Sequence, residues 1–129
     1  MPRIVIDLDD TITQDRSSAE YREKLPNLDV VEKLREYRAQ GFEIVIHSAR
    51  NMRSFAGAIG RINVHTLPIV LEWLARHDVP FDEVIMGKPW CGEGGFYVDD
   101  KTVRPDEFAR LSLDEIYALV GSAAPGDAP

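Results

Sequence analysis

The stretch Arg3-Ile4-Val5-Ile6-Asp7-Leu8-Asp9-Asp10 decides the expected fold, because an apolar run ends there in a group of carboxylates. Such β-branched residues are typical of a strand that is buried on both faces of a parallel sheet. An aspartate in a buried strand is costly unless it is paired or binds a metal ion. Asp7 and Asp9 are two residues apart, which places both side chains on the same side of a strand. The stretch therefore predicts a buried strand that delivers charged groups to a ligand site, and the alternative for Asp7 is an ordinary turn at a strand end.

Further apolar runs predict the rest of the sheet. They span residues 42–47, 84–86 and 96–98. A helical pattern covers residues 29–38, 66–77 and 112–120, and the last of these begins with a Ser112/Glu115 capping box. Strands that alternate with helices are typical of a mostly parallel sheet with helices on both faces. We therefore expect an α/β protein with a single domain over residues 1–121 and a disordered tail over residues 122–129.

Two polar stretches interrupt this alternation. Residues 14–24 have no clear hydrophobic period, and we expect them to form a flexible flap after the first strand. Residues 49–64 are small and polar, and we expect an excursion loop there. Neither gap between the strands holds enough residues for an additional domain over the site, so the domain is expected to lack a cap.

Polar residues follow every predicted strand. They are Asp7, Asp9 and Asp10 after the first, Ser48 after the second, Lys88 after the third, and Asp99 with Asp100 after the fourth. The carboxyl ends of parallel strands meet at one edge of the sheet, where ligands bind. Like charges this close favour a neutralising cation, and Mg²⁺ prefers oxygen ligands. The sequence thus predicts a Mg²⁺ site formed by Asp7, Asp9 and a third carboxylate from Asp99 or Asp100.

Four motifs in chain order resemble those of the haloacid dehalogenase superfamily. They are Asp7-Leu8-Asp9-Asp10-Thr11, Ile44-Val45-Ile46-His47-Ser48, Lys88 in Gly87-Lys88-Pro89, and Phe96-Tyr97-Val98-Asp99-Asp100. Finer features are similar to its capsular polysaccharide biosynthesis phosphatase branch, namely Ser48-Ala49-Arg50-Asn51-Met52, Glu72-Trp73-Leu74, Gly87-Lys88-Pro89-Trp90 and Tyr97-Val98-Asp99-Asp100-Lys101. The sequence departs from this pattern in two places, with Ser48 where threonine is frequent and Asp10 where glycine is frequent.

The resemblance implies a fold and a reaction. The fold would be a haloacid dehalogenase-like domain, and the reaction a Mg²⁺-dependent hydrolysis of a phosphate monoester through a phosphoaspartate. Asp7 would attack phosphorus, and Asp9 would protonate the leaving group and then activate water. Ser48 and Lys88 would hold the phosphoryl oxygens.

The resemblance also implies roles around this centre. Asp100 is favoured as the direct metal ligand, and Asp99 would then bind a metal-bound water or pair with a lysine. Arg50 lies where it would bind a second anionic group of the substrate, although a solvated loop arginine is an equal alternative. Trp90 would stack on a sugar face, and a packing role is its alternative. The implied substrate is a sugar phosphate or a glycan-precursor phosphate.

Composition narrows the choice of partners. The chain has 129 residues and a formal net charge of −7, which disfavours nucleic acids and anionic membrane surfaces as partners. Cys91 is the only cysteine, so neither an internal disulfide nor a cysteine-rich zinc site is expected. No apolar run approaches the roughly 20 residues of a membrane span. We expect a cytoplasmic protein, and a homo-oligomer in which a neighbouring subunit covers the open site.

Two other functions remain compatible with the sequence. The first is a phosphatase for nucleic-acid ends or phosphoproteins. The second is a phosphate-binding or phospho-accepting regulatory domain without turnover. Asp9 favours an enzyme, since it supplies the acid and base that a slow phospho-switch lacks.

Overall fold

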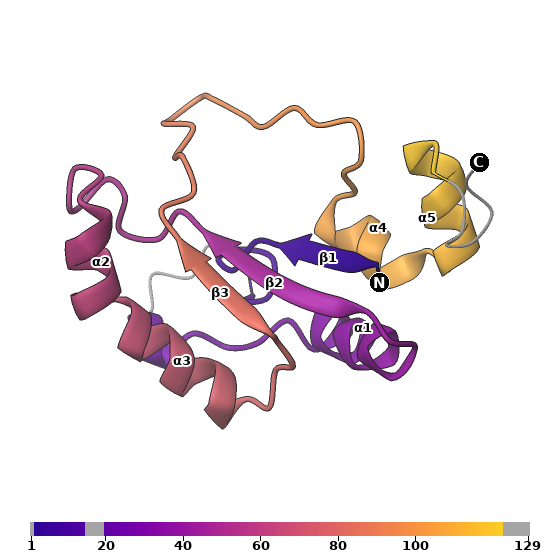
Figure 1. Cartoon of the computed structure of the whole chain (residues 1–129), viewed down its shortest axis with the longest axis horizontal. Coiled ribbons are helices and arrows are strands. Elements are labelled where there is room, and N and C mark those ends of the chain that lie inside the picture. The colour runs from indigo at the N-terminus through magenta and orange to yellow at the C-terminus, as the bar shows by residue number, and fades with distance from the viewer. Residues whose placement is uncertain (1, 15–19, 123–129) are drawn as a thin grey trace.

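A three-stranded parallel sheet lies at the centre of the computed structural model, which describes residues 2–14 and 20–122 (Figure 1). Its strands are β1 (Arg3–Ile6), β2 (Glu43–Ser48) and β3 (Glu83–Met86), and β2 lies in the middle. Both pairings are parallel, with Ile4 opposite Ile44 and Ile46 opposite Val84. The α/β class and the parallel sheet predicted from the sequence are confirmed.

The helices fill the connections between and after the strands. They are the 3-10 helix η1 (Tyr21–Glu23), α1 (Leu28–Ala39), α2 (Ile59–His65), α3 (Leu67–Arg76), α4 (Pro105–Arg110) and α5 (Leu113–Val120). The capping box at the start of α5 forms as predicted, because Ser112 and Glu115 each accept a hydrogen bond from the other's backbone N–H. The predicted loop over residues 49–64 is wrong at its end, where α2 forms. That helix packs on α3 and β3, and tertiary packing outweighs its weak local signal.

The hydrophobic core lies on one face of the sheet. Successive strand residues point to opposite faces, and Ile6, Ile44 and Ile46 are all buried in the core cluster. Helices α1 and α3 contribute seven further members, namely Val30, Val31, Leu34, Tyr37, Val70, Trp73 and Leu74. The opposite face is less well covered, since Val5 and Ile85 expose 62% and 46% of their surface.

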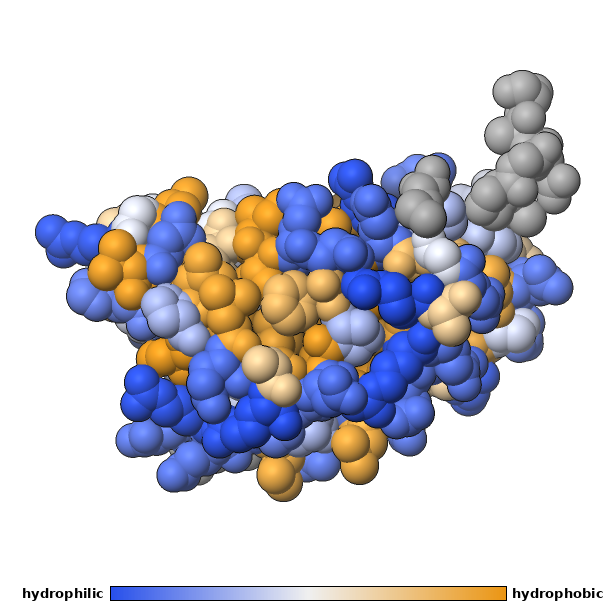
Figure 2. All heavy atoms as spheres, turned by 60° about the horizontal axis from the view of Figure 1, so that its bottom comes forward, coloured by the Kyte–Doolittle hydropathy of each residue, from blue (hydrophilic) through white to orange (hydrophobic). Residues whose placement is uncertain are grey.

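Apolar side chains also reach the surface. Figure 2 shows them in the middle of the face that it views, with hydrophilic residues around them. None of the described helices is both long enough and apolar enough to cross a bilayer.

The predicted fourth strand over residues 96–98 is wrong in this structure. The segment from residue 87 to 104 contains no helix or strand and arcs away from the sheet (Figure 1). Phe96 and Val98 expose 78% and 86% of their surface. The run is short, and Gly92 and Gly94 before it both adopt positive φ. Glycines cost backbone entropy in a strand and offer no side chain to pack, so local sequence favours a turn-rich loop.

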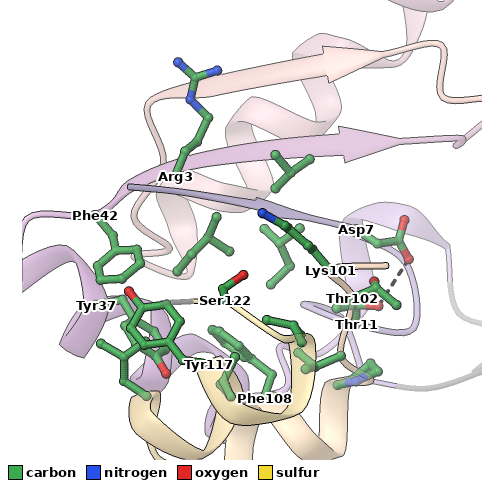
Figure 3. Close-up of a pocket in the computed structure, with 18 of the residues that line it drawn as sticks. Arg3, Asp7, Thr11, Tyr37, Phe42, Lys101, Thr102, Phe108, Tyr117 and Ser122 are labelled. Carbon is green, nitrogen blue, oxygen red and sulfur yellow. Dashed lines mark hydrogen bonds between the residues drawn. The ribbon is translucent and has the colours of Figure 1, made fainter. Parts of the chain in front are cut away.

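The edge of β1 that faces away from β2 therefore has no strand partner among the described residues. A cavity of about 350 Å³ runs along this edge. Figure 3 shows β1 on one side of it and the helices α4 and α5 on the other. Phe42, Phe108 and Tyr117 line its apolar part, while Asp7 and Lys101 lie at its polar end.

The predicted flap is described only in part. Residues 15–19 lie outside the described residues, as do residues 123–129 of the predicted tail. The described end of the flap contains η1 and is tied to the domain by backbone hydrogen bonds, including one from Gln14 N to Leu25 O of 2.7 Å. The buried indole N–H of Trp73 donates to the carbonyl of Lys24 at 2.8 Å. The C-terminal end of the flap is thus held in place by a hydrogen bond to the core residue Trp73.

Candidate active site

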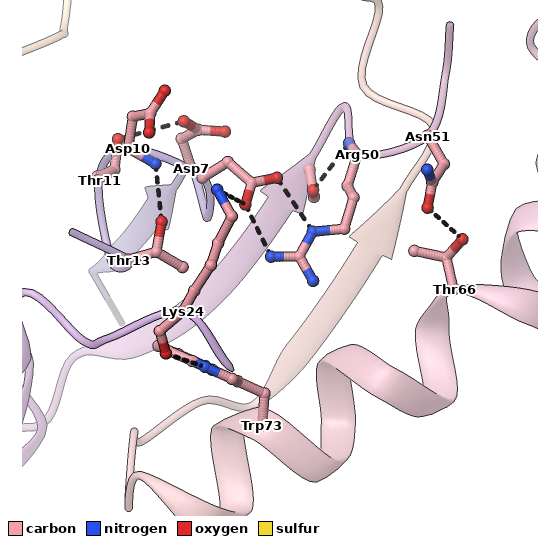
Figure 4. Close-up of polar contacts among 11 residues, drawn as sticks. Asp7, Asp10, Thr11, Thr13, Lys24, Arg50, Asn51, Thr66 and Trp73 are labelled. Carbon is pink, nitrogen blue, oxygen red and sulfur yellow. Dashed lines mark hydrogen bonds and ion pairs between the residues drawn. The ribbon is translucent and has the colours of Figure 1, made fainter. Parts of the chain in front are cut away.

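Asp7 lies directly after β1 and carries the first charge of the site. Its Oδ1 is 3.6 Å from Nζ of Lys88. Its Oδ2 accepts a hydrogen bond from the hydroxyl of Thr11 at 3.2 Å (Figure 4). Burial raises the pKa of Asp7, whereas the Lys88 ammonium and then the Thr11 hydroxyl act to lower it. Asp9 is a smaller, like-charged contribution that raises this pKa further. The carboxylate is therefore partly desolvated and balanced by one lysine.

Asp9 is held by two cations from distant parts of the chain. Its Oδ2 accepts from Arg50 Nε at 3.0 Å, and its Oδ1 accepts from Arg50 Nη2 at 2.7 Å (Figure 4). Nζ of Lys24 lies 3.8 Å from the same Oδ1. The ring of Tyr21 covers Arg50, with the guanidinium carbon 4.0 Å from the ring centroid.

Lys24 and Tyr21 were not found by sequence reasoning. Both lie in the predicted flap, where no hydrophobic period or motif marks them. No local signal identifies their partners, because Lys24 and Asp9 are separated in the sequence by a long irregular segment and meet only in the folded chain.

Ser48, the last residue of β2, fixes the backbone around these charges. Its Oγ accepts a hydrogen bond from the backbone N–H of Arg50 at 3.0 Å. Its carbonyl accepts from the backbone N–H of Lys88 at 3.1 Å, which extends the pairing of β2 with β3. Ser48 is buried and does not line the cavity at the site. Ser48 thus fixes the backbone from which the side chains of Arg50 and Lys88 extend.

An open cavity of about 440 Å³ brings most of the predicted site residues together. Those that line it are Asp7, Asp9, Arg50, Lys88 and Trp90, with Tyr21, Arg53 and Tyr97 beside them. Nζ of Lys88 lies 4.2 Å from the ring centroid of Tyr97, and the guanidinium carbon of Arg53 lies 5.5 Å from that of Trp90. The cavity therefore combines carboxylates, cations and aromatic faces, a set that suits a small anionic ligand.

Asp99 and Asp100 do not join this group. Both are exposed, and neither lines the cavity. Asp99 Oδ1 accepts from the backbone N–H of Lys101 at 3.0 Å, and this hydrogen bond is the main cause of the lowered pKa of Asp99. Because the segment from residue 87 to 104 does not pair with β1, it does not carry the two aspartates to the sheet edge.

A complete Mg²⁺ site is therefore not formed by the residues that the structure describes. No three histidine, cysteine, aspartate or glutamate side chains within the described ranges are grouped closely enough to hold a metal ion. Both oxygens of Asp9 are bound by Arg50, so the carboxylates nearest the site are already neutralised by protein cations. In this arrangement the donor set does not fit the ion.

The fold and the site define a class of protein: a small α/β domain with a three-stranded parallel sheet, consistent with a capless haloacid dehalogenase-like fold, and with a carboxylate–lysine pair at the carboxyl ends of its strands. Among solved structures, the chain is similar to a crystallised protein from Vibrio cholerae, with 57% identity and a TM-score of 0.91. The match covers 94% of this chain and 98% of that one. The chain therefore belongs to the same protein family as this Vibrio cholerae protein.

Other solved structures are similar at lower identity. A chain of the Pnkp1/Rnl/Hen1 complex matches with a TM-score of 0.50 and 21% identity, over 67% of this chain and 28% of that one. The D,D-heptose 1.7-bisphosphate phosphatase from B. bronchiseptica, complexed with magnesium and phosphate, has a TM-score of 0.45 and 15% identity, over 67% and 49% of the two chains. No protein-family model matches the chain, and no curated protein sequence matches it significantly.

Proposed function

We propose that the protein is a phosphomonoester hydrolase in which Asp7 is the nucleophile. The observation that carries this proposal is the pair of Asp7 and Lys88, 3.6 Å apart at the wall of an open cavity. A carboxylate and a phosphate ester repel each other, so attack needs a cation beside both. Lys88 occupies that place, and it can hold a phosphoryl oxygen as negative charge moves from the nucleophile to the phosphate.

The reaction would proceed in two displacements. An oxygen of Asp7 forms a bond to phosphorus while the bond from phosphorus to the ester oxygen breaks, and Asp9 gives a proton to the departing alkoxide. A water molecule then attacks the phosphoaspartate, Asp9 takes its proton, and inorganic phosphate leaves with the carboxylate of Asp7 restored. The hydroxyl of Ser48 is proposed to donate to a phosphoryl oxygen, which requires it to become accessible when substrate binds.

Mg²⁺ belongs to the proposal as the expected cofactor, with Asp7, Asp9 and Asp100 as ligands and Asp99 holding a metal-bound water. Because the described donor set does not fit the ion in this arrangement, no step above passes through it. The requirement is open to a direct measurement, namely phosphate release with added Mg²⁺ and with EDTA.

The proposed substrate is a sugar phosphate or a glycan-precursor phosphate. Trp90 exposes 44% of its surface and borders the cavity, so its ring is available to stack on a sugar face. Arg53 lies beside it and is paired with Glu93 at 3.2 Å. We further propose that the protein acts in the cytoplasm and forms a homo-oligomer whose neighbouring subunit covers the open cavity.

The test is phosphate release from a panel of sugar phosphates, phosphopeptides, phosphorylated oligonucleotides and generic aryl phosphates. Wild type, Asp7→Asn and the control Asp106→Asn are compared, since Asp106 is exposed at the start of α4 and does not line the cavity. We expect release by wild type and by the control, and loss of at least about 10³-fold in Asp7→Asn because the nucleophile is absent.

Release that Asp7→Asn leaves unchanged would overturn the proposed nucleophile. Folded wild type that releases phosphate from none of the panel would contradict the proposed activity. A best substrate among the oligonucleotides or phosphopeptides would replace the proposed substrate class.

A further inference from the structure

The buried guanidinium of Arg50 is paired with a single carboxylate, that of Asp9. Its side chain is 1% exposed, and two parallel hydrogen bonds join it to the two oxygens of Asp9. A bidentate guanidinium–carboxylate pair fixes the plane of the carboxylate as well as its position. Arg50 therefore restrains the orientation of Asp9 more tightly than a single lysine contact would.

The arginine is itself fixed on several sides. Its backbone N–H donates to Oγ of Ser48, and the ring of Tyr21 covers the guanidinium. Its Nη1 is buried without a hydrogen-bond partner among the described residues. A buried, unpaired donor is costly, and a ligand cannot contact an atom that is closed to solvent. In this arrangement Nη1 is therefore not available to a second anionic group of the substrate.

Lys24 supplies a second anchor for Asp9. Its Nζ lies 3.8 Å from Oδ1, the oxygen that also accepts from Arg50 Nη2. The lysine is tied to the core because its carbonyl accepts from the indole N–H of Trp73. Oδ1 thus meets two cations, whereas Oδ2 meets one. A carboxylate oxygen has two lone-pair positions, so Oδ2 keeps one of them available.

We infer that Arg50, assisted by Lys24, is a positioning residue that orients Asp9 so that Oδ2 exchanges the proton with the leaving group and the attacking water. The inference rests on the proposed function, in which Asp9 is the acid and base. In this inference Arg50 affects the reaction only by orienting Asp9. Lys24, which no sequence motif marks, helps to hold Asp9 in place.

The test compares two substrates whose leaving groups differ in their need for a proton. Departure of an alkoxide from a sugar phosphate needs an acid, whereas departure of p-nitrophenolate does not. In Arg50→Met we expect kcat/KM, which reports the step in which the leaving group departs, to fall by about 10²-fold for the sugar phosphate and at least about tenfold less for p-nitrophenyl phosphate. Arg50→Lys restores only part of this loss, since an ammonium cannot form the bidentate pair. Lys24→Met shifts the ratio in the same direction but by a smaller factor.

Three controls separate this role from a structural one. Arg61→Met removes an exposed arginine of α2 and leaves both rates unchanged. In an Asp9→Asn background, Arg50→Met changes kcat/KM by no more than about twofold, because coupled residues are not additive. Thermal unfolding of each variant reports whether it is folded at the assay temperature.

Equal losses on both substrates in folded Arg50→Met would overturn the inference, and so would a full further loss in the Asp9→Asn background. Neither result touches the proposed function, which depends on wild-type release and its loss in Asp7→Asn.

Discussion

Two regions carry residues of the same predicted site but differ in how firmly the structure holds them. They are the carboxyl ends of β1 and β2, and the segment from residue 87 to 104. At the strand ends, Asp7 and Asp9 each have a cation within 4 Å, and backbone hydrogen bonds fix the residues that provide the cations. In the segment, Phe96, Val98 and both aspartates are exposed. The contrast shows that the two aspartates of the fourth motif stay outside the site while the run before them is unpaired, although Tyr97 of that run lines the cavity.

The physical difference lies in the pairing. Each residue of β1 has a partner in β2, and β2 also pairs with β3, so the side chains after these strands start from fixed backbone. Residues 96–98 have no such ladder in this structure. The free edge of β1 and the cavity beside it are the place where such a strand would pair, and this edge leaves unpaired backbone groups.

The largest expected effect concerns the strand ends. Lys88→Met removes the cation beside Asp7, and we expect kcat/KM to fall by about 10² to 10³-fold, a loss typical of one electrostatic stabiliser. Lys88 lowers the pKa of Asp7, so its removal raises this pKa further. The acid limb of the profile of kcat/KM against pH should therefore move to higher pH in the variant. An acid limb that stays at the same pH would show that ionisation of Asp7 does not determine this limb.

The next effect probes whether residues 96–100 take part in the reaction. If residues 96–100 move to the edge of β1 when Mg²⁺ binds, Asp100→Asn should lower activity by about 10-fold or more and raise the Mg²⁺ concentration needed for half-maximal activity. Asp99→Asn should have the smaller effect. Hydrogen exchange with Mg²⁺ would then protect the amides of residues 96–98. Activity and exchange that are indifferent to Asp100 and to Mg²⁺ would exclude residues 96–100 from the site.

A smaller effect tests how the core anchors the flap. Trp73→Phe keeps an aromatic ring but removes the donor to the Lys24 carbonyl. The unpaired, buried carbonyl should cost about 1 to 3 kcal/mol in the free energy of unfolding, measured by urea denaturation. His77→Phe is a matched control, since His77 contacts the same indole ring at 4.5 Å without a hydrogen bond to Lys24. An equal loss in both variants would assign the effect to packing alone.

The smallest effect concerns the exposed apolar side chains of the segment. Val98→Ser should change the free energy of unfolding by no more than about 0.5 kcal/mol, because substitutions at exposed positions have little effect. Val45→Ser, at a buried position of β2, should cost several times more. A loss at Val98 as large as that at Val45 would mean that the segment packs on the domain in solution.

The sequence by itself was sufficient for β1, β2, β3, α1, α3 and α5, because each has a local apolar period or a capping signal. It also placed Asp7, Asp9 and Lys88 at one edge, since the carboxyl ends of parallel strands meet there. Asp10 adopts φ 60°, the left-handed region that favours glycine, which accounts for the frequency of glycine at this position in the motif that the sequence resembles.

Only the tertiary structure decided which charges meet. The pair of Asp9 and Arg50 joins residues that are 41 positions apart, and Lys24 reaches Asp9 from an irregular segment. Such contacts depend on the relative placement of strands and flap, for which short motifs contain no signal. The fate of residues 96–98 was decided in the same way. An apolar run of three residues favours a strand. The strand forms only if pairing with β1 outweighs the entropic cost of ordering the glycine-rich loop before it, and the whole fold sets that balance.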